Sequence, residues 1–200
     1  MATDSSMHVY FNWAKERIDE MEAALASLES KANEMQGGAS AKAEQLRTDL
    51  RKQCDEFRHI LKKQDKANDA SWSKAKQQLE GRWNAFETEV RKYVESFGDQ
   101  AKQQQATFKL QADAQVKAWR EAAEVFRSTG KEFETKRRAE IEASAKRMEA
   151  DAAAAQEKLR KLNEAGAQSW SVLMAALKET RATFDRANQA AQDAFRKAAA

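Results

Sequence analysis

The chain has 200 residues with no proline, six glycines and one cysteine, and 34% of its residues are charged although the net charge is only +3. Its apolar content of 42% includes 40 alanines, which leaves too few large side chains for the thick core of an α/β enzyme. Abundant Ala, Leu, Glu, Lys and Arg is typical of long helices and coiled coils, and 16 aromatic residues argue against a disordered chain.

The same numbers exclude several other classes of protein. Tight β-turns need proline or glycine, so an all-β fold is excluded. No apolar run approaches the roughly 18 residues of a membrane span, and residues 1–6 do not begin a secretory signal. Cys54 has no partner for an internal disulfide, which predicts a reducing, cytoplasmic setting. The basic stretches at 62–66 and 136–138 have acidic residues nearby, so we expect solvated helix faces and no nucleic-acid partner.

The first predicted element is an amphipathic helix within residues 1–38. Its apolar residues alternate by three and four positions from Phe11 to Met35, and this period of 3.5 is typical of a coiled-coil seam. Gly37 and Gly38 then predict the end of the helix, because paired glycines raise the entropy of the backbone and permit the left-handed conformation.

The next apolar stripe extends over residues 41–97, with a phase slip near 61–72 and a strongly aromatic second part. No proline interrupts it, so it is predicted as one helix that Gly81 weakens only locally. Gly98 and Asp99 predict the turn that ends it. Residues 39–200 as a whole are predicted to form a long helical bundle or coiled-coil region.

Two more stretches complete the chain. A helix is predicted over residues 100–127, followed by a break candidate at 128–130, but Phe133 keeps the seven-residue phase, so a helix that continues through this point is an alternative. A seam of small residues follows from 141 to 166, where Gly166 is a weak break, and the final helix carries its aromatic residues on one side. Because large knobs facing small ones fill space well, we expect the bulky seam before residue 98 to pack on the small one, either within the chain or between copies in an oligomer.

One pattern occurs three times within residues 39–200. It begins with Ala, and Trp follows five residues later. Leu or Phe stands seven residues after the Trp, Phe stands seven residues after that, and an acidic residue comes next. The units are 67–87, 114–134 and 165–185. An old duplication of a helical unit and chance matching in a heptad-patterned chain both account for it. The glycines fall at different offsets in each unit, which excludes a solenoid.

Motifs that carry chemistry are missing from the sequence. There is no glycine-rich phosphate loop, no H-E-x-x-H and no cysteine pair. Glu56 and His59 form one E-x-x-H, but di-iron bundles need two such motifs. The glutamine tract at 103–105 is typical of an exposed helix. We therefore predict no catalytic residues, no cofactor and no metal site.

The aromatic stripes are the most unusual feature, and they have two interpretations: they anchor a core, or they contact an apolar partner outside the chain. The candidate interaction residues are Trp72, Leu79, Trp83, Phe86, Val90, Tyr93, Phe97, Trp119, Phe126, Phe133, Trp170, Leu177 and Phe184.

Proline-free helices rich in Ala, Gln, Lys and Glu with spaced aromatic residues, as at residues 83–86 and 184–191, resemble phasins and exchangeable apolipoproteins. That resemblance implies a coat on a lipid or polymer-granule surface. From the residues themselves we predict an all-α, elongated antiparallel helical bundle or coiled coil. Its predicted role is a non-enzymatic scaffold or protein-interaction protein that associates with itself or with a helical partner through its Ala and aromatic seams. The amphipathic coat is the alternative.

Overall fold

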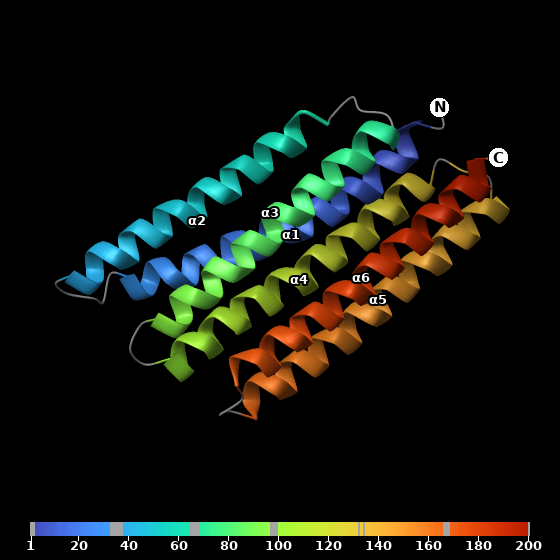
Figure 1. Cartoon of the computed structure of the whole chain (residues 1–200). Helices are drawn as coiled ribbons and strands as arrows, with labels where there is room; N and C mark the ends of the chain where they lie inside the picture. Colours follow the sequence, from blue (N-terminus) through green and yellow to red (C-terminus); the bar gives the residue numbers. More distant parts are fainter. Residues whose placement is uncertain are drawn as a thin grey trace.

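The structure is a computed structural model that describes residues 3–32, 38–64, 69–96, 100–131, 133, 135–165 and 169–199. These ranges form six helices: α1 (Thr3–Ala32), α2 (Gly38–Lys62), α3 (Asp69–Ser96), α4 (Gln100–Gly130), α5 (Thr135–Glu164) and α6 (Trp170–Ala199). They contain no strand, so the predicted all-α class is confirmed. Successive helices alternate in direction and lie side by side as an antiparallel bundle (Figure 1). A helix of 30 residues is about 45 Å long, which sets the long axis of the bundle.

The bundle consists of two three-helix groups. Helices α1, α2 and α3 pack on one another, and α4, α5 and α6 do the same. The groups meet where α1 packs against α4 and α6, with a smaller contact between α3 and α4. In Figure 1, α2 and α5 lie on the outer sides of the molecule, and α1, α4 and α6 lie between them.

The predicted break after the first helix falls between two described helices. The structure ends α1 at Ala32 and begins α2 at Gly38, while Gly37 lies outside the described residues. The predicted continuous helix over 41–97 is wrong, because α2 ends at Lys62 and a turn follows at 63–64. Folding back at this point is favoured because it buries the aromatic stripe of α3 against α1: the rings of Tyr10 and Trp72 meet edge to face with centroids 4.9 Å apart.

The break candidate at 128–130 is confirmed, and the alternative of a helix that continues through it is wrong. Helix α4 ends at Gly130, and the amide of Phe133 donates to the Gly130 carbonyl oxygen at 3.2 Å. The start of α5 then passes so close that a Cβ atom on Gly130 would lie 2.7 Å from Cγ2 of Ile141. Only glycine fits this crossing without displacement of α5. The other two turn candidates, Gly98 with Asp99 and Gly166, lie outside the described residues.

Two apolar cores fill the bundle. The first core joins α1, α2 and α3 to the neighbouring parts of α4 and α6 and to Leu159 of α5, and the second core lies among α4, α5 and α6. Within the chain, the small seam of α5 does not pack on the bulky seam of α3, contrary to the prediction. Its alanines instead face Trp119, Phe126 and Phe184. Large side chains therefore do face small ones, but the helices that meet are neighbours in sequence, which short connections favour.

Candidate functional site

The predicted interaction residues lie in the interior of the single chain. Phe133 is half-buried beyond the end of α4, and Phe97 lies outside the described residues. The others are each at most 6% exposed, namely Trp72, Leu79, Trp83, Phe86, Val90, Tyr93, Trp119, Phe126, Trp170, Leu177 and Phe184. Their rings contact other helices of the same chain, as Trp119 does with Phe184, at a centroid distance of 5.6 Å. Contact of these residues with an outside partner stays a prediction.

The repeated pattern falls on three helices that have different neighbours. The described part of its first unit, 69–87, lies on α3, residues 114–130 of its second unit lie on α4 with Phe133 beyond the helix end, and its third unit lies on α6 from Trp170 onward. Trp72 and Trp170 belong to the first core, whereas Trp119 belongs to the second. Each tryptophan thus anchors its helix in an apolar core, which is the ordinary use of a large ring in an Ala-rich bundle.

The unexpected feature of the interior is a buried polar seam. Among the described residues, every buried polar or charged side chain belongs to α1, α4 or α6, the helices at which the two groups meet. We call this set the polar seam; it consists of Glu16, Arg17, Glu20, Ser27, Gln103, Thr107, Gln111, Gln115, Thr180, Arg181, Asn188 and Gln192. Burying so many polar groups is costly unless they bond to one another, so their partners decide what the seam does.

Arg181 lies at the centre of the polar seam. Its guanidinium forms a two-pronged pair with Glu20, with N–O distances of 3.0 and 2.9 Å, and reaches Glu87 of α3 at 2.9 Å. The same group stacks over the ring of Trp83, 4.5 Å from its centroid. One side chain of α6 therefore fixes the positions of α1 and α3. The planar guanidinium group can bind both carboxylates at once, which the single ammonium group of a lysine does less well.

Further bonds extend the polar seam in both directions. Arg17 forms a second two-pronged pair across the seam, with Asp185, at 2.9 and 2.8 Å. The Gln115 amide donates to Glu20 at 2.9 Å, which ties α4 to the same charged group. About two turns further along α1, the hydroxyl groups of Ser27 and Thr107 lie 2.8 Å apart. The seam thus joins α1 to α4 and α6 through paired polar groups between Arg17 and Ser27 of α1, whereas Oε1 of Gln111 and Nε2 of Gln192 have no partner among the described residues.

Two carboxyl groups one helical turn apart, Glu16 and Glu20, have opposite ionisation in this setting. Burial raises the pKa of Glu16 well above its ordinary value, and the nearby Glu20 adds to the rise against the opposing charge of Arg17. Burial also opposes ionisation of Glu20, but the charge and hydrogen bonds of Arg181 outweigh it and lower the pKa of Glu20. The Arg17 guanidinium donates to Oε2 of Glu16 at 2.6 Å, while no donor among the described residues reaches Oε1. The raised pKa favours a proton on this carboxyl, through which it bonds to Glu20.

A carboxyl group with a raised pKa is a common feature of acid catalysts, but access decides whether it serves as one. The gap that lies beside Glu16, Gln115 and Thr180 is too small for a water molecule. A substrate has no path to Glu16 in this closed arrangement. The paired charges hold helices together here, and their geometry gives no support to a reaction.

The other titratable candidates are separate from one another. Cys54 is buried, which raises the pKa of its thiol to about 11, so it is a poor nucleophile. Glu56 pairs with Arg82 at 2.7 Å, and His59 is exposed on the surface of α2. In the part of the chain that the structure describes, no three His, Cys, Asp or Glu side chains gather where a metal ion would need them.

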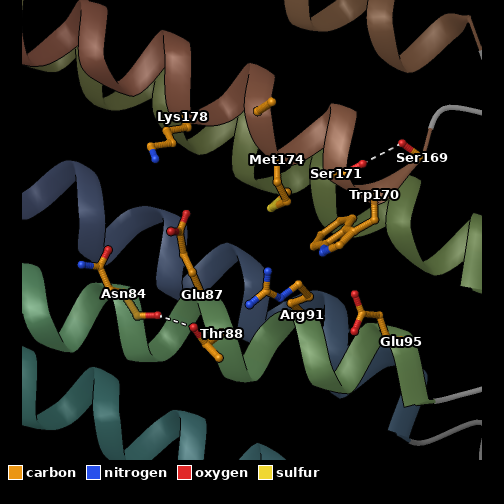
Figure 2. A pocket seen from close by; sticks show the side chains of 11 residues that line it. Asn84, Glu87, Thr88, Arg91, Glu95, Ser169, Trp170, Ser171, Met174 and Lys178 are labelled. Atoms are coloured by element: carbon orange, nitrogen blue, oxygen red, sulfur yellow. Dashed lines mark hydrogen bonds between the residues drawn. The ribbon is translucent and has the colours of Figure 1, made fainter.

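A groove between α3 and α6 hollows the surface next to Arg181. It has a volume of about 670 Å³, and its walls are one face of each helix (Figure 2). Over the described residues, no Cα atom of α3 comes within 8 Å of one on α6. Trp170 and Met174 project into the groove from α6, while Glu87 and Arg91 face them from α3. This is the place where the bundle offers space, apolar surface and charge together.

The chain matches no protein-family model, no curated protein and no solved structure. In the described helices, no segment is both long and apolar enough to cross a membrane. Function therefore has to be argued from the polar seam and from the groove.

The sequence analysis did not identify the polar seam, although α4 carried one signal of it. Gln103, Thr107, Gln111 and Gln115 repeat at every fourth position and are uncharged in a chain that is one-third charged. Such a stripe on one helix face indicates polar burial rather than exposure. The expectation that the whole glutamine tract is exposed is wrong for Gln103, which is buried and donates to Ser27 Oγ at 3.0 Å.

Proposed function

We propose that the protein is a non-enzymatic helical scaffold that presents a fixed, charged exterior to protein partners. The buried polar seam is the observation that carries this proposal. Buried ion pairs add little net stability, since desolvation cancels much of their attraction, but they penalise any other arrangement of the helices. Arg17, Glu20 and Arg181 lie where the two three-helix groups meet. Their ion pairs therefore hold α1 and α6 in one register and oppose sliding of the helices.

The outer surface agrees with such a role. Among the described residues, Leu110 and Val172 are the only large apolar side chains that are substantially exposed, at 38% and 43%. The rest of the exterior carries paired charges, such as Arg127 with Glu149 at 2.7 Å. A partner is therefore recognised through charge and shape more than through apolar area.

Self-association through the Ala and aromatic seams stays a prediction. The sequence favours self-association because narrow apolar seams on single helices leave too little core within one chain. Five described tryptophans, at residues 13, 72, 83, 119 and 170, are each at most 6% exposed in the single chain. Burial of these rings does not need a second copy, so an oligomer has to use other faces or exchange helices between chains.

The amphipathic coat remains the second candidate, and one observation favours it. Among the described residues, α2, α3 and α5 bury only apolar side chains and are charged outside, so one of these helices released from the bundle has the form that binds an apolar surface. The polar seam is where such an opening would start, because its groups regain water when the halves separate. A coat therefore requires the seam to open, whereas a scaffold requires it to stay closed.

A disulfide across the polar seam separates the two candidates. In the variant S27C/T107C, made in a Cys54→Ala background, the two thiols replace hydroxyl groups that lie 2.8 Å apart and join α1 to α4. The oxidised and reduced forms of this variant are a matched pair. Each is mixed with lipid vesicles or apolar polymer particles, and tryptophan emission, helicity and sedimentation with the particles are measured.

If the protein is a scaffold, the tryptophan emission of both forms is blue-shifted without particles and does not change when particles are added. Heating then abolishes the blue shift in one cooperative step. A coat predicts that the reduced form sediments with particles and that oxidation prevents it. Binding to particles by the reduced form alone would therefore replace the scaffold with the coat as the function.

A further inference from the structure

We propose that the groove between α3 and α6 is a binding site for an apolar organic anion, a molecule that joins a hydrocarbon or aromatic body to a carboxylate or phosphate. This inference goes beyond the scaffold function and does not depend on it. The volume of about 670 Å³ lies within the range of small-molecule sites, roughly 300–1,000 Å³.

The first support is an unsatisfied donor in the wall of the groove. Trp170 is only 6% exposed, and its indole Nε1–H has no acceptor in the described chain. Figure 2 shows the ring inside the groove with its nitrogen turned toward the α3 side. A buried indole N–H normally finds a partner, so an acceptor on a bound molecule would complete it.

The second support is the balance of charge. Arg91 and Lys178 line the groove from opposite walls, and neither forms an ion pair with another described residue. Glu87, the acid nearest the polar seam, is already paired with Arg181 at 2.9 Å. Glu95 on the same wall is not free either. The groups left to recruit a ligand are therefore cationic, and a guanidinium suits a carboxylate or a phosphate.

The third support comes from the end of the groove. Helix α6 begins at Trp170, and Ser169 and Ser171 line the groove beside it, with their hydroxyl groups hydrogen-bonded to each other at 2.9 Å. The positive end of a 30-residue helix adds to the attraction for an anion there. The indole N–H, the two cations and the helix end thus favour the same sign of ligand charge.

The body of the ligand is apolar because the α6 wall carries apolar side chains beside Lys178 and the two serines. The Trp170 ring, the half-buried Met174 side chain and the exposed Ala175 line this part of the groove. Methionine and tryptophan adapt to varied apolar shapes, so this wall suits a flexible chain or a flat ring. A fully hydrated anion such as free phosphate would leave this surface unused.

The test uses the purified full-length protein and three probes with the same hydrocarbon tail: decanoate, decyl phosphate and decyltrimethylammonium, each below its micelle concentration. Binding is measured by calorimetry and by nitrogen–proton correlation spectra. The indole signal of Trp170 is assigned by its loss in Trp170→Phe. We expect one molecule of decanoate or decyl phosphate per chain, with a downfield shift of that indole proton, and no binding of the cation.

Two variants with the same change of charge complete the test. R91Q/K178Q removes the cations of the groove, and R138Q/K146Q removes two exposed cations of α5, which does not line it. We expect the first to weaken anion binding about tenfold or more, the effect of one charge-assisted hydrogen bond, and the second to leave it unchanged.

The tighter anion of the two identifies the preferred head group. Equal binding of the cation, equal loss in R138Q/K146Q, or an indole proton that does not move would each overturn the site. The thermal unfolding of both double variants is recorded as well, so that lost binding is not mistaken for lost folding.

Discussion

At the scale of single residues, the polar seam shows how a shared environment separates two identical groups. Glu16 and Glu20 lie on one face of α1, and both are fully buried. Arg181 approaches Glu20 from α6 with two of its nitrogens, and its third nitrogen reaches Glu87. This two-pronged pair outweighs burial and lowers the pKa of Glu20. Glu16 accepts from Arg17, but burial and the adjacent Glu20 carboxylate outweigh that pair and raise the pKa of Glu16.

This difference predicts how stability depends on pH. The raised pKa of Glu16 means that the folded chain keeps a proton that the unfolded chain loses above the ordinary glutamate pKa of about 4.3. Stability from this group is therefore complete at low pH and is lost as pH rises toward the raised value. Glu16→Gln stays neutral and escapes that loss. We expect its free energy of unfolding, measured in urea, to exceed that of the parent increasingly from pH 4 to pH 8.

The lowered pKa of Glu20 has the opposite effect, since its stability is present at higher pH and lost as pH falls. Arg181, the larger cause of that lowering, is present in both proteins, and the amide of Glu16→Gln replaces the acid as a donor to Glu20, so most of this effect cancels in the difference. Glu140→Gln is the control, because Glu140 is exposed on α5. Its difference from the parent should be nearly constant with pH. A flat difference for Glu16→Gln as well would show that Glu16 is ionised in the folded chain.

At the scale of helices, close packing depends on where small residues fall. The first turn of α5 can cross the end of α4 only because Gly130 has no side chain, whereas Gly81 in the middle of α3 faces open space. The two glycines look alike in the sequence. Their roles are opposite, since one permits a crossing and the other only adds backbone freedom to the unfolded chain.

The substitution of glycine by alanine should therefore lower the free energy of unfolding at one of the two positions and raise it at the other. Gly130→Ala places a methyl group 2.7 Å from Cγ2 of Ile141, and we expect a loss of about 1–3 kcal/mol in the free energy of unfolding. Gly81→Ala meets nothing within 4 Å, and we expect a gain of about 0.5–1 kcal/mol. Urea unfolding followed by circular dichroism measures both. A gain at residue 130 would mean that α5 does not pass close to the end of α4.

At the scale of the whole molecule, three helices link the two cores, and α5 does so with Leu159 in the first core and Ile141 in the second. Helix α4 places Phe108 in the first core and Phe126 in the second, and α6 does the same with Leu177 and Phe184. A helix that belongs to two cores cannot leave one without disturbing the other. The two three-helix groups are therefore parts of one cooperative unit rather than independent domains.

The variant Trp119→Phe tests whether the two cores unfold together. It removes the tryptophan of the second core, and the four others belong to the first core. Tryptophan emission then reports on the first core, whereas circular dichroism reports on all helices. We expect the two urea transitions of this variant to coincide. Emission that changes at a clearly different urea concentration from the helical signal would show that the groups unfold separately.

The sequence by itself determined the helices and their inner faces. Composition excluded strands, and the spacing of apolar residues identified the aromatic faces that the structure buries, from Trp72 in α3 to Phe184 in α6. These features are local: a helix repeats every 3.6 residues, so its apolar side is visible in a short stretch of sequence. The break at Gly130 was visible for the same reason.

Only the tertiary structure decided which faces meet, where the chain turns back after Lys62, and that charged residues lie inside. Glu20 and Arg181 are 161 positions apart, and each resembles an ordinary exposed helix residue until the other is placed beside it. The groove beside Trp170 likewise exists only because α3 and α6 stand apart over α1 and α4. Partner choice among helices depends on contacts between distant segments, and periodicity along one segment carries no information about them.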